Sequence, residues 1–324
     1  MTAATERGLG RARTSRPPRA AHGRVAGKAA DSVLLVASAA AVVIIVLMLL
    51  VVLGDALWHG ASTLSLGFLT EAPRGGMLAG GVGPAIFGTA ALTIVMTVAA
   101  VPIGVLTAIF LAEYAAEGSW LARMVRLSVA NLAGVPSIVF GLFGLGFFVQ
   151  AIGRGIDRVA FGGQVTYGQP SLVWAALTLA ILTLPVVIVA TEEALRAVPR
   201  SMRDASLALG ATKLQTTFGV VVPQALGGIL TGAILAVSRG AGEVAPILFT
   251  GAAFFLPELP THLNDQFMHL GYHVYVLATQ SPDVDRTKPI LYASVLVLLG
   301  LTFALNAVAI VIRARTRRGA AARG

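Results

Sequence analysis

The chain has 324 residues, of which 56% are hydrophobic and 12% are charged. Soluble domains carry about a quarter charged residues, so this composition indicates an integral membrane protein. The net charge is +9, but the basic residues concentrate in the two tails, without the basic domain that a nucleic-acid-binding protein needs. Cysteine is absent, which excludes disulfides, thiol nucleophiles and thiolate metal sites.

Six apolar segments are long enough to cross a bilayer core, which takes about 20 residues. They are Ser32–Leu53, Pro84–Ala112, Arg126–Ile152, Ser171–Ala190, Leu226–Gly251 and Ile290–Ile312, the third being broken by Pro136. We therefore expect an all-α integral membrane protein with six spans. Its domains would be a basic tail (1–30), a transmembrane domain (31–312) and a second basic tail (313–324).

The distribution of basic residues predicts the orientation. An even number of spans places both termini on one side of the membrane. If that side is the cytoplasm, 18 Lys and Arg residues lie inside and five lie outside. The sequence thus predicts a multi-pass protein of the bacterial cytoplasmic membrane with both termini cytoplasmic.

The sequence offers no metal site. His262, His269 and His273 follow the fifth span, but their spacing does not match a zinc site. We expect these histidines to be solvated or to lie at the membrane interface.

The connection between the fourth and fifth spans, about 198–223, is too long and too helix-prone for a passive loop. We predict one helix over 201–209, ended by Gly210 in a left-handed conformation, and a second over 211–218. Pro223 would then begin the fifth span. The residues alone leave two interpretations open: an amphipathic element that rests on lipid, or one that docks a partner.

The spacing in this connection carries a family resemblance. Asp204-Ala205-Ser206, Gly210 and a terminal Val-x-Val-Pro resemble the "EAA" motif of ABC importer permeases, with Asp in place of Glu and Ser in place of the second Ala. The resemblance implies that Asp204, Ala205, Ser206 and Gly210 belong to a coupling helix that docks into an ATPase subunit.

Three further segments narrow the resemblance. "GTAALTIVMTVAAVPIGVLTAIFLAEYA" (88–115), "NLAGVPSIVFGLFGLGFF" (131–148) and "SRGAGEVAPILFTGAA" (238–253) resemble the PstA family, the type I permeases of bacterial phosphate ABC importers. The usual Glu-Thr-Ala-Pro is here Glu-Val-Ala-Pro, so one hydroxyl is missing at Val244.

The resemblance implies a six-span permease with several partners. These are a PstC-like permease as heterodimer partner, two ATPase subunits that bind ATP and Mg, and an external phosphate-binding protein. No segment of this chain matches the Walker A pattern, so we expect a transport subunit without cofactors of its own rather than an enzyme.

Arg239 and Glu243 are the main candidates for the translocation pathway or its gate. We expect both near the middle of the fifth span, on one face and one turn apart, where a charged residue usually faces the bundle interior or an aqueous cavity. Arg239 would contact the oxyanion, since its planar guanidinium donates two hydrogen bonds. Pro246 would leave the carbonyl of Gly242 without a helical donor. A structural ion pair is the alternative.

Weaker candidates lie in the third span. Asn131 and Ser137 are possible pathway groups, although such polar residues more often join helices together, and Pro136 is a possible kink or hinge. Pro246 in the fifth span is a further possible pathway or hinge residue. Three other functions stay open at this stage: a permease for another oxyanion such as sulfate or molybdate, an ion-driven secondary transporter, and a membrane scaffold without transport, against which the charges in the fifth span argue.

Overall fold

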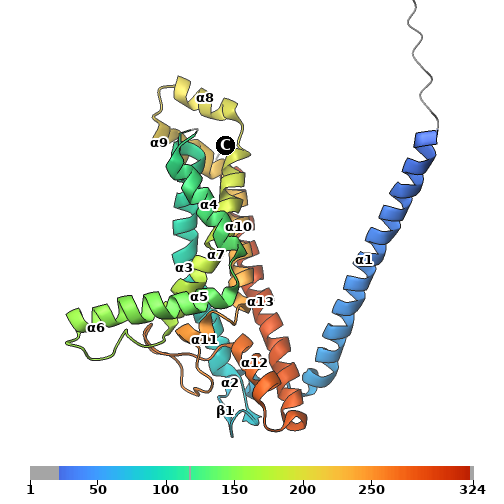
Figure 1. The fold of residues 1–324 in the computed structure, drawn as a ribbon, viewed down its shortest axis with the longest axis vertical. Coiled ribbons are helices and arrows are strands. Elements are labelled where there is room, and N and C mark those ends of the chain that lie inside the picture. The colour runs from blue at the N-terminus through green and yellow to red at the C-terminus, as the bar shows by residue number, and fades with distance from the viewer. Residues whose placement is uncertain (1–21, 117, 322–324) are drawn as a thin grey trace, which may run out of the picture. The chain divides into compact units, whose positions relative to one another are not determined.

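The structure is a computed structural model that describes residues 22–116 and 118–321 (Figure 1). Most of the predicted N-terminal tail and the last residues of the C-terminal tail lie outside the described residues. The chain divides into two units, Met1–Asp55 and Ala56–Gly324.

The first unit contains one long helix, α1 (His22–Gly60), whose last turn belongs to the second unit. The helical segment Asp31–Thr63, which contains most of α1 and the short helical turn after it, is long and apolar enough to cross a membrane and agrees with the predicted first span. Side chains from Val33 to Val52 are largely exposed. Such an apolar exposed helix is suited to a lipid environment.

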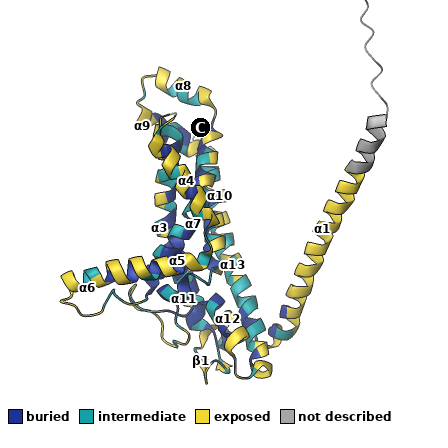
Figure 2. Ribbon diagram, in the orientation of Figure 1, coloured by how far each residue is buried: buried dark blue, intermediate teal, exposed yellow. Residues whose placement is uncertain are grey.

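The second unit is built around four long helices. They are α3 (Gly83–Ile109), α7 (Leu172–Arg196), α10 (Val222–Gly242) and α13 (Val284–Ala321). α7 packs against both α3 and α10, which also contact each other, and α13 packs against α10. Figure 2 shows the buried residues concentrated where these helices meet. Together with α1 and a helical segment over Ser137–Ala160, the described residues contain six segments long and apolar enough to cross a membrane, which is the predicted number.

Buried threonines show how polar groups are accommodated in this apolar core. Thr89 and Thr93 on α3 donate to the carbonyls of Ala85 and Thr89, and Thr178 on α7 donates to that of Trp174, each at 2.7 Å. A hydroxyl that bonds within its own helix needs neither water nor a neighbouring helix.

The prediction for the third span is wrong at its start. Residues 120–134 form a separate helix, α4 (Trp120–Gly134), which ends before Pro136. The chain then turns and forms α5 (Ser137–Gly144), a π-helical segment η3 (Leu145–Gly153) and α6 (Arg154–Ala160). Because proline disfavours the helical conformation in the residue before it, the helix cannot run through Val135. In Figure 1, α5 and α6 run across α3 and α7 rather than alongside them.

Two groups of short elements lie at opposite ends of the bundle (Figure 1). At one end are the described elements α8 (Arg200–Ala208) and α9 (Lys213–Thr216). At the other end are η1 (Ala61–Thr63), α2 (Leu66–Thr70), the antiparallel strands β1 (Pro73–Arg74) and β2 (Ala79–Gly80), α11 (Ile247–Thr250) and α12 (Leu270–Gln280).

Of the two roles expected for the histidines, exposure to solvent is wrong for two of the three. His262 is largely exposed, but His269 is 0% exposed and His273 is 2% exposed. α12 packs against α13 and α3, and its first turns enter the core. Burial lowers the pKa of His269 to about 3 and that of His273 to about 4, because it disfavours the charged imidazolium. Within the described residues, no group of three or more His, Asp or Glu residues is arranged for a metal ion.

Candidate functional site

The helix–turn–helix predicted between the fourth and fifth spans is present, with a different second helix. α8 ends at Ala208, and Gly210 has φ of +87°, the left-handed conformation predicted for the helix terminator. Nothing lies within 4 Å of a Cβ built at Gly210, so the backbone angle alone favours glycine there.

The predicted second helix is part of the fifth span rather than a separate element. It begins with Thr212, which forms a capping box with Gln215, and α9 continues through the π-helical segment η4 (Thr217–Val221) into α10. Pro223 therefore lies inside a continuous helical span, Lys213–Gly242, rather than at its beginning. The π-helical turn just before Pro223 accommodates the missing donor.

α8 presents a largely uncovered surface. No residue of α8 is buried, and Asp204, Ala205, Leu207 and Leu209 are exposed, Leu209 to 90%. Ser206 points inward instead, where its hydroxyl lies 2.9 Å from the Thr216 hydroxyl of α9. Exposed leucines beside an exposed carboxylate are a surface suited to contact with another protein.

An ion pair that sequence reasoning missed anchors α8 to the rest of the bundle. Arg203 donates to both carboxylate oxygens of Glu113, at 2.7 and 3.3 Å, and to the backbone carbonyls of Leu195 and Val198. Glu113 belongs to η2 (Phe110–Tyr114), the π-helical end of the second span. Both side chains are largely buried, with exposures of 18% and 10%. One guanidinium therefore ties α8 to the ends of two spans.

The signal for this pair was an isolated glutamate at the end of an apolar span, inside the segment 88–115. Its partner lies 90 residues further along the chain, and only the fold brings the two together.

We predicted Arg239 and Glu243 near the middle of a continuous helix, and this prediction is wrong. α10 ends at Gly242, and Glu243 follows it with an extended backbone (φ −76°, ψ 130°). Pro246 then begins the separate short helix α11. Two glycines in the last turn and a proline four residues after Gly242 remove both the rigidity and the donor that a continuous helix needs. Pro246 thus stands at the start of a new element.

This break changes the electrostatics of the pair. Arg239 lies in the last turn of α10, where the partial negative charge of the helix end favours a cation. Its Nε lies 3.5 Å from Oε1 of Glu243, and the side chains are 48% and 21% exposed. The contact between the two side chains is therefore long, and its arginine is about half exposed.

Small residues recur every four positions along α10, at Gly228, Gly232, Ala236 and Gly240, and this stripe has the spacing that favours close helix contact. A Cβ at Gly228 would lie 2.4 Å from the Cβ of Ala194, and one at Gly232 would lie 2.8 Å from that of Ala190, both on α7. At Gly240 it would meet Met96 of α3 at 2.3 Å. The stripe therefore packs inside this chain and leaves Arg239 on a neighbouring strip.

The remaining candidates are distributed over two elements. Pro136 is the N-cap of α5, and Ser137 is its half-buried first residue. α5 packs against α11, and a Cβ at Gly141 would approach the Pro246 carbonyl to 2.9 Å. Asn131 is exposed on α4, before the break. The structure thus brings α5 to the break after Glu243 and leaves Asn131 on a different helix.

Comparison with known proteins identifies the family of this chain. The profile of the family described as "Binding-protein-dependent transport system inner membrane component" matches residues 101–318, more than half of the chain. The chain belongs to this family. It is therefore a multi-pass inner-membrane permease component of an ABC importer and not an enzyme, which confirms two predictions from the sequence.

Several curated relatives are similar to this permease. The probable ABC transporter permease protein YqgI of Bacillus subtilis is 32% identical over 70% of this chain and 76% of that protein. The phosphate transport system permease protein PstA of Xylella fastidiosa is 33% identical over 72% and 79%. PstA 1 of Mycobacterium tuberculosis is 40% identical, but the alignment spans only 56% of each chain.

The solved structures support the fold. The permease matches a chain of the inward-facing MetNI methionine ABC transporter with a TM-score of 0.53 and 19% identity, over 72% of this chain and 94% of that one. This likeness confirms the type I ABC importer permease fold predicted from the sequence.

Proposed function

We propose that this permease imports inorganic phosphate, as one half of a heterodimeric pathway powered by separate ATPase subunits. Phosphate as the substrate is supported by the similarity to proteins named phosphate transport system permease protein PstA, at 32–40% identity. Membership of an ABC importer family argues against the ion-driven secondary transporter. A permease for another oxyanion, such as sulfate or molybdate, is the second candidate.

The proposed partners follow from this function. A PstC-like permease completes the pathway, two ATPase subunits bind ATP and Mg, and an external phosphate-binding protein delivers the substrate. Both termini lie in the cytoplasm, together with α8. The exposed face of α8, with Asp204, Ala205 and Leu209, is the surface that docks the ATPase.

The anchoring of α8 supports a coupling role. When the ATPase dimer closes on ATP, α8 moves with it. Because Arg203 bonds to Glu113 and to carbonyls at the end of α7, a displacement of α8 is transmitted to the second and fourth spans at once. Gly210 and the Thr212 cap keep α8 at a fixed angle to the fifth span.

In the proposed pathway, Arg239 is the group that meets phosphate. Its guanidinium is half-exposed and is held by a single long contact to Glu243, so it can exchange that carboxylate for an anion in transit. Glu243 would repel phosphate, and its role is to hold Arg239 between transport events or to pair with a basic residue of the partner permease. Because α10 ends at Gly242, Glu243 is outside the helix and its backbone is free to move for this exchange.

Reconstituted transport tests the proposal. The permease is co-purified with its partners, placed in vesicles, and assayed for ATP-dependent uptake of labelled phosphate with sulfate as competitor. We expect an ATPase subunit to co-purify and sulfate to leave phosphate uptake unchanged. Uptake of sulfate or molybdate in place of phosphate would support the second candidate instead.

A further inference from the structure

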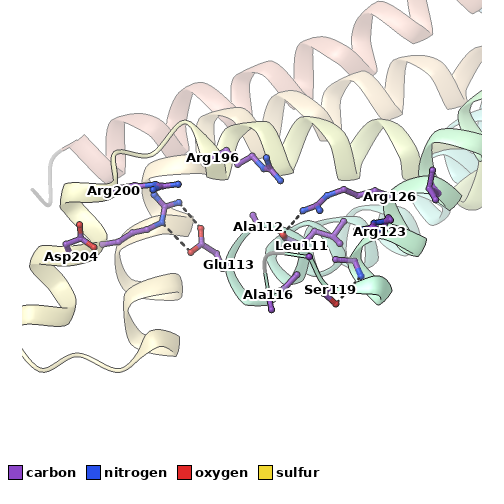
Figure 3. Close-up of a pocket in the computed structure, with 15 residues that line it drawn as sticks. Leu111, Ala112, Glu113, Ala116, Ser119, Arg123, Arg126, Arg196, Arg200 and Asp204 are labelled. Atoms are coloured by element: carbon purple, nitrogen blue, oxygen red, sulfur yellow. Dashed lines mark hydrogen bonds and ion pairs between the residues drawn. The ribbon is translucent and has the colours of Figure 1, made fainter.

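A large cavity opens between the α7–α8 corner and the start of α4, at the same end of the bundle as α8. It has a volume of about 910 Å³ and is lined by residues of η2, the following turn, α4, α7 and α8. Figure 3 shows Arg123 and Arg126 on the α4 side and Arg196 and Arg200 on the α7–α8 side. We call this cavity the arginine pocket.

The arginine pocket is electropositive. Five arginines line it, and its described lining contains only two carboxylates, Glu113 and Asp204. Of the arginines, Arg203 is paired with Glu113. Arg126 and Arg196 share one oxygen of Glu192, at 3.0 and 2.7 Å, so a single carboxylate serves two cations. The described part of the lining therefore retains an excess of positive charge.

Two of the arginines are open to a ligand. The side chains of Arg123 and Arg200 have no hydrogen bond or ion pair with any residue that the structure describes, and both are exposed. They come from opposite sides of the pocket, since Arg123 lies on α4 and Arg200 is the first residue of α8. Each of them can donate charge-assisted hydrogen bonds to a negatively charged group in the pocket.

An apolar groove adjoins the arginine pocket. It has a volume of about 460 Å³, runs between α4 and α7, and is lined by small and aliphatic residues such as Val129, Ala130, Ala133 and Val189. The groove and the pocket share Leu111 and Arg126, so one continues into the other. The groove leads along the apolar spans, whereas the pocket lies at their end.

We propose that the pocket and the groove together bind an anionic phospholipid. Its phosphate-bearing headgroup contacts Arg123 and Arg200, and an acyl chain lies along the groove between α4 and α7. The ligand must be anionic because the pocket retains excess arginine, and it must carry a long apolar part because the charged pocket opens into an apolar groove. Basic pockets between spans at the membrane surface suit acidic lipid headgroups. Free phosphate would satisfy the arginines but not the groove.

Native mass spectrometry of the purified transporter complex tests this. The delipidated complex is titrated with phosphatidylglycerol or with phosphatidylcholine of the same acyl chains. We expect phosphatidylglycerol to bind about tenfold more tightly, which corresponds to about 1.4 kcal/mol. The double variant Arg123→Ala/Arg200→Ala should lose this preference. Arg158→Ala removes an exposed arginine of α6, outside the pocket, and should change nothing. Thermal unfolding of each variant verifies its fold.

Ala133→Trp tests the groove. Ala133 is exposed, so a larger side chain can enter the groove without entering the core. We expect this variant to weaken both lipids while leaving the charge preference intact. Equal binding of the two lipids by wild type, or an unchanged preference in the double arginine variant, would overturn the proposal.

Two further experiments distinguish a bound lipid from free phosphate and from a partner subunit. In the first, inorganic phosphate is added at about tenfold excess over the lipid, a margin that distinguishes ligands of similar affinity. If phosphate displaced phosphatidylglycerol and itself bound through Arg123 and Arg200, the site would be one for free phosphate. Because the chain has no cysteine, an Ala130→Cys variant carries the only thiol of this chain. Protection of that thiol from maleimide in the delipidated complex would show that a partner subunit covers the groove, which would also overturn the lipid site.

Discussion

Two arginine–glutamate pairs in this permease differ in almost every physical respect. Arg203 and Glu113 are 90 residues apart, mostly buried, and joined by two hydrogen bonds, and Arg203 also bonds to two carbonyls. Arg239 and Glu243 are four residues apart, more exposed, and joined by one 3.5 Å contact. The first pair has the geometry of an anchor, while the second can open without disturbing the fold. Charge alone therefore does not identify a transport site, and the number of other contacts that an arginine makes separates the two roles.

The largest effect on stability is expected from the anchor. Glu113→Ala leaves Arg203 buried without its carboxylate, and breaking such a pair costs about 3–5 kcal/mol. Thermal or denaturant unfolding of the purified permease measures this. Glu71→Ala is the matched control, because Glu71 forms a 3.4 Å pair with Arg74 in which both side chains are about half or more exposed. That change should cost less than about 1 kcal/mol. Similar losses in both variants would contradict the anchoring role.

A second large effect is expected from acid. The pKa of His273 is about 4 in the folded chain, against 6.5 for a free histidine, because burial disfavours its charged form. Above pH 6.5 both states are neutral and His273 contributes nothing to the pH dependence. Below it the unfolded chain binds a proton that the folded chain refuses, so stability falls by up to about 1.4 kcal/mol per pH unit until pH 4 is approached.

Substitution separates this histidine from other acid-sensitive groups. His273→Phe keeps an aromatic ring and removes the titration, so unfolding between pH 7 and 4.5 should depend less on pH than in wild type. His262→Phe changes a histidine that is largely exposed and should leave the pH dependence as it was. A pH profile that both variants share with wild type would show that His273 is not responsible.

The packing stripe of α10 gives a smaller effect with a clear sign. Gly228→Ala places a methyl group 2.4 Å from the Cβ of Ala194, and overpacking of this kind costs about 1–3 kcal/mol. Gly219→Ala is the control, because nothing lies within 4 Å of the added Cβ. In that helical position, alanine should be neutral or stabilise by about 0.5–1 kcal/mol. Unfolding measurements that rank the two variants in the opposite order would contradict the close contact of α10 with α7.

The elements that could be predicted from the sequence are those fixed by local chemistry. The six spans follow from apolar length, and Gly210 was identified because a helix end needs a left-handed residue. The packing stripe follows from four-residue spacing. Errors arose where apolar composition and helix-breaking residues give opposite predictions. The apolar composition continues past Pro136 and Gly242, but the helices end there. Glu113 could not be paired with Arg203 because only the tertiary fold brings them together, and the same holds for the burial of His269 and His273.

The smallest effect on stability is expected for the Arg239–Glu243 pair, where substitutions should affect transport much more than stability. Arg239→Ala and Glu243→Gln should each change the free energy of unfolding by less than about 1 kcal/mol, because a half-exposed, long ion pair contributes little. If Arg239 meets phosphate, the Arg239→Ala complex should assemble normally and lose phosphate uptake, measured in vesicles with ATP inside.

The double variant Arg239→Ala/Glu243→Gln decides between a pathway residue and a purely structural ion pair. A structural pair is needed only because one unpaired charge is costly, so removing both charges should restore uptake. A pathway arginine cannot be replaced in this way, because no cation is left to meet the oxyanion, and uptake should stay as low as in Arg239→Ala. Recovery of uptake in the double variant would therefore reduce Arg239 and Glu243 to the same kind of role as Arg203 and Glu113, and the contrast between the two pairs would be one of strength alone.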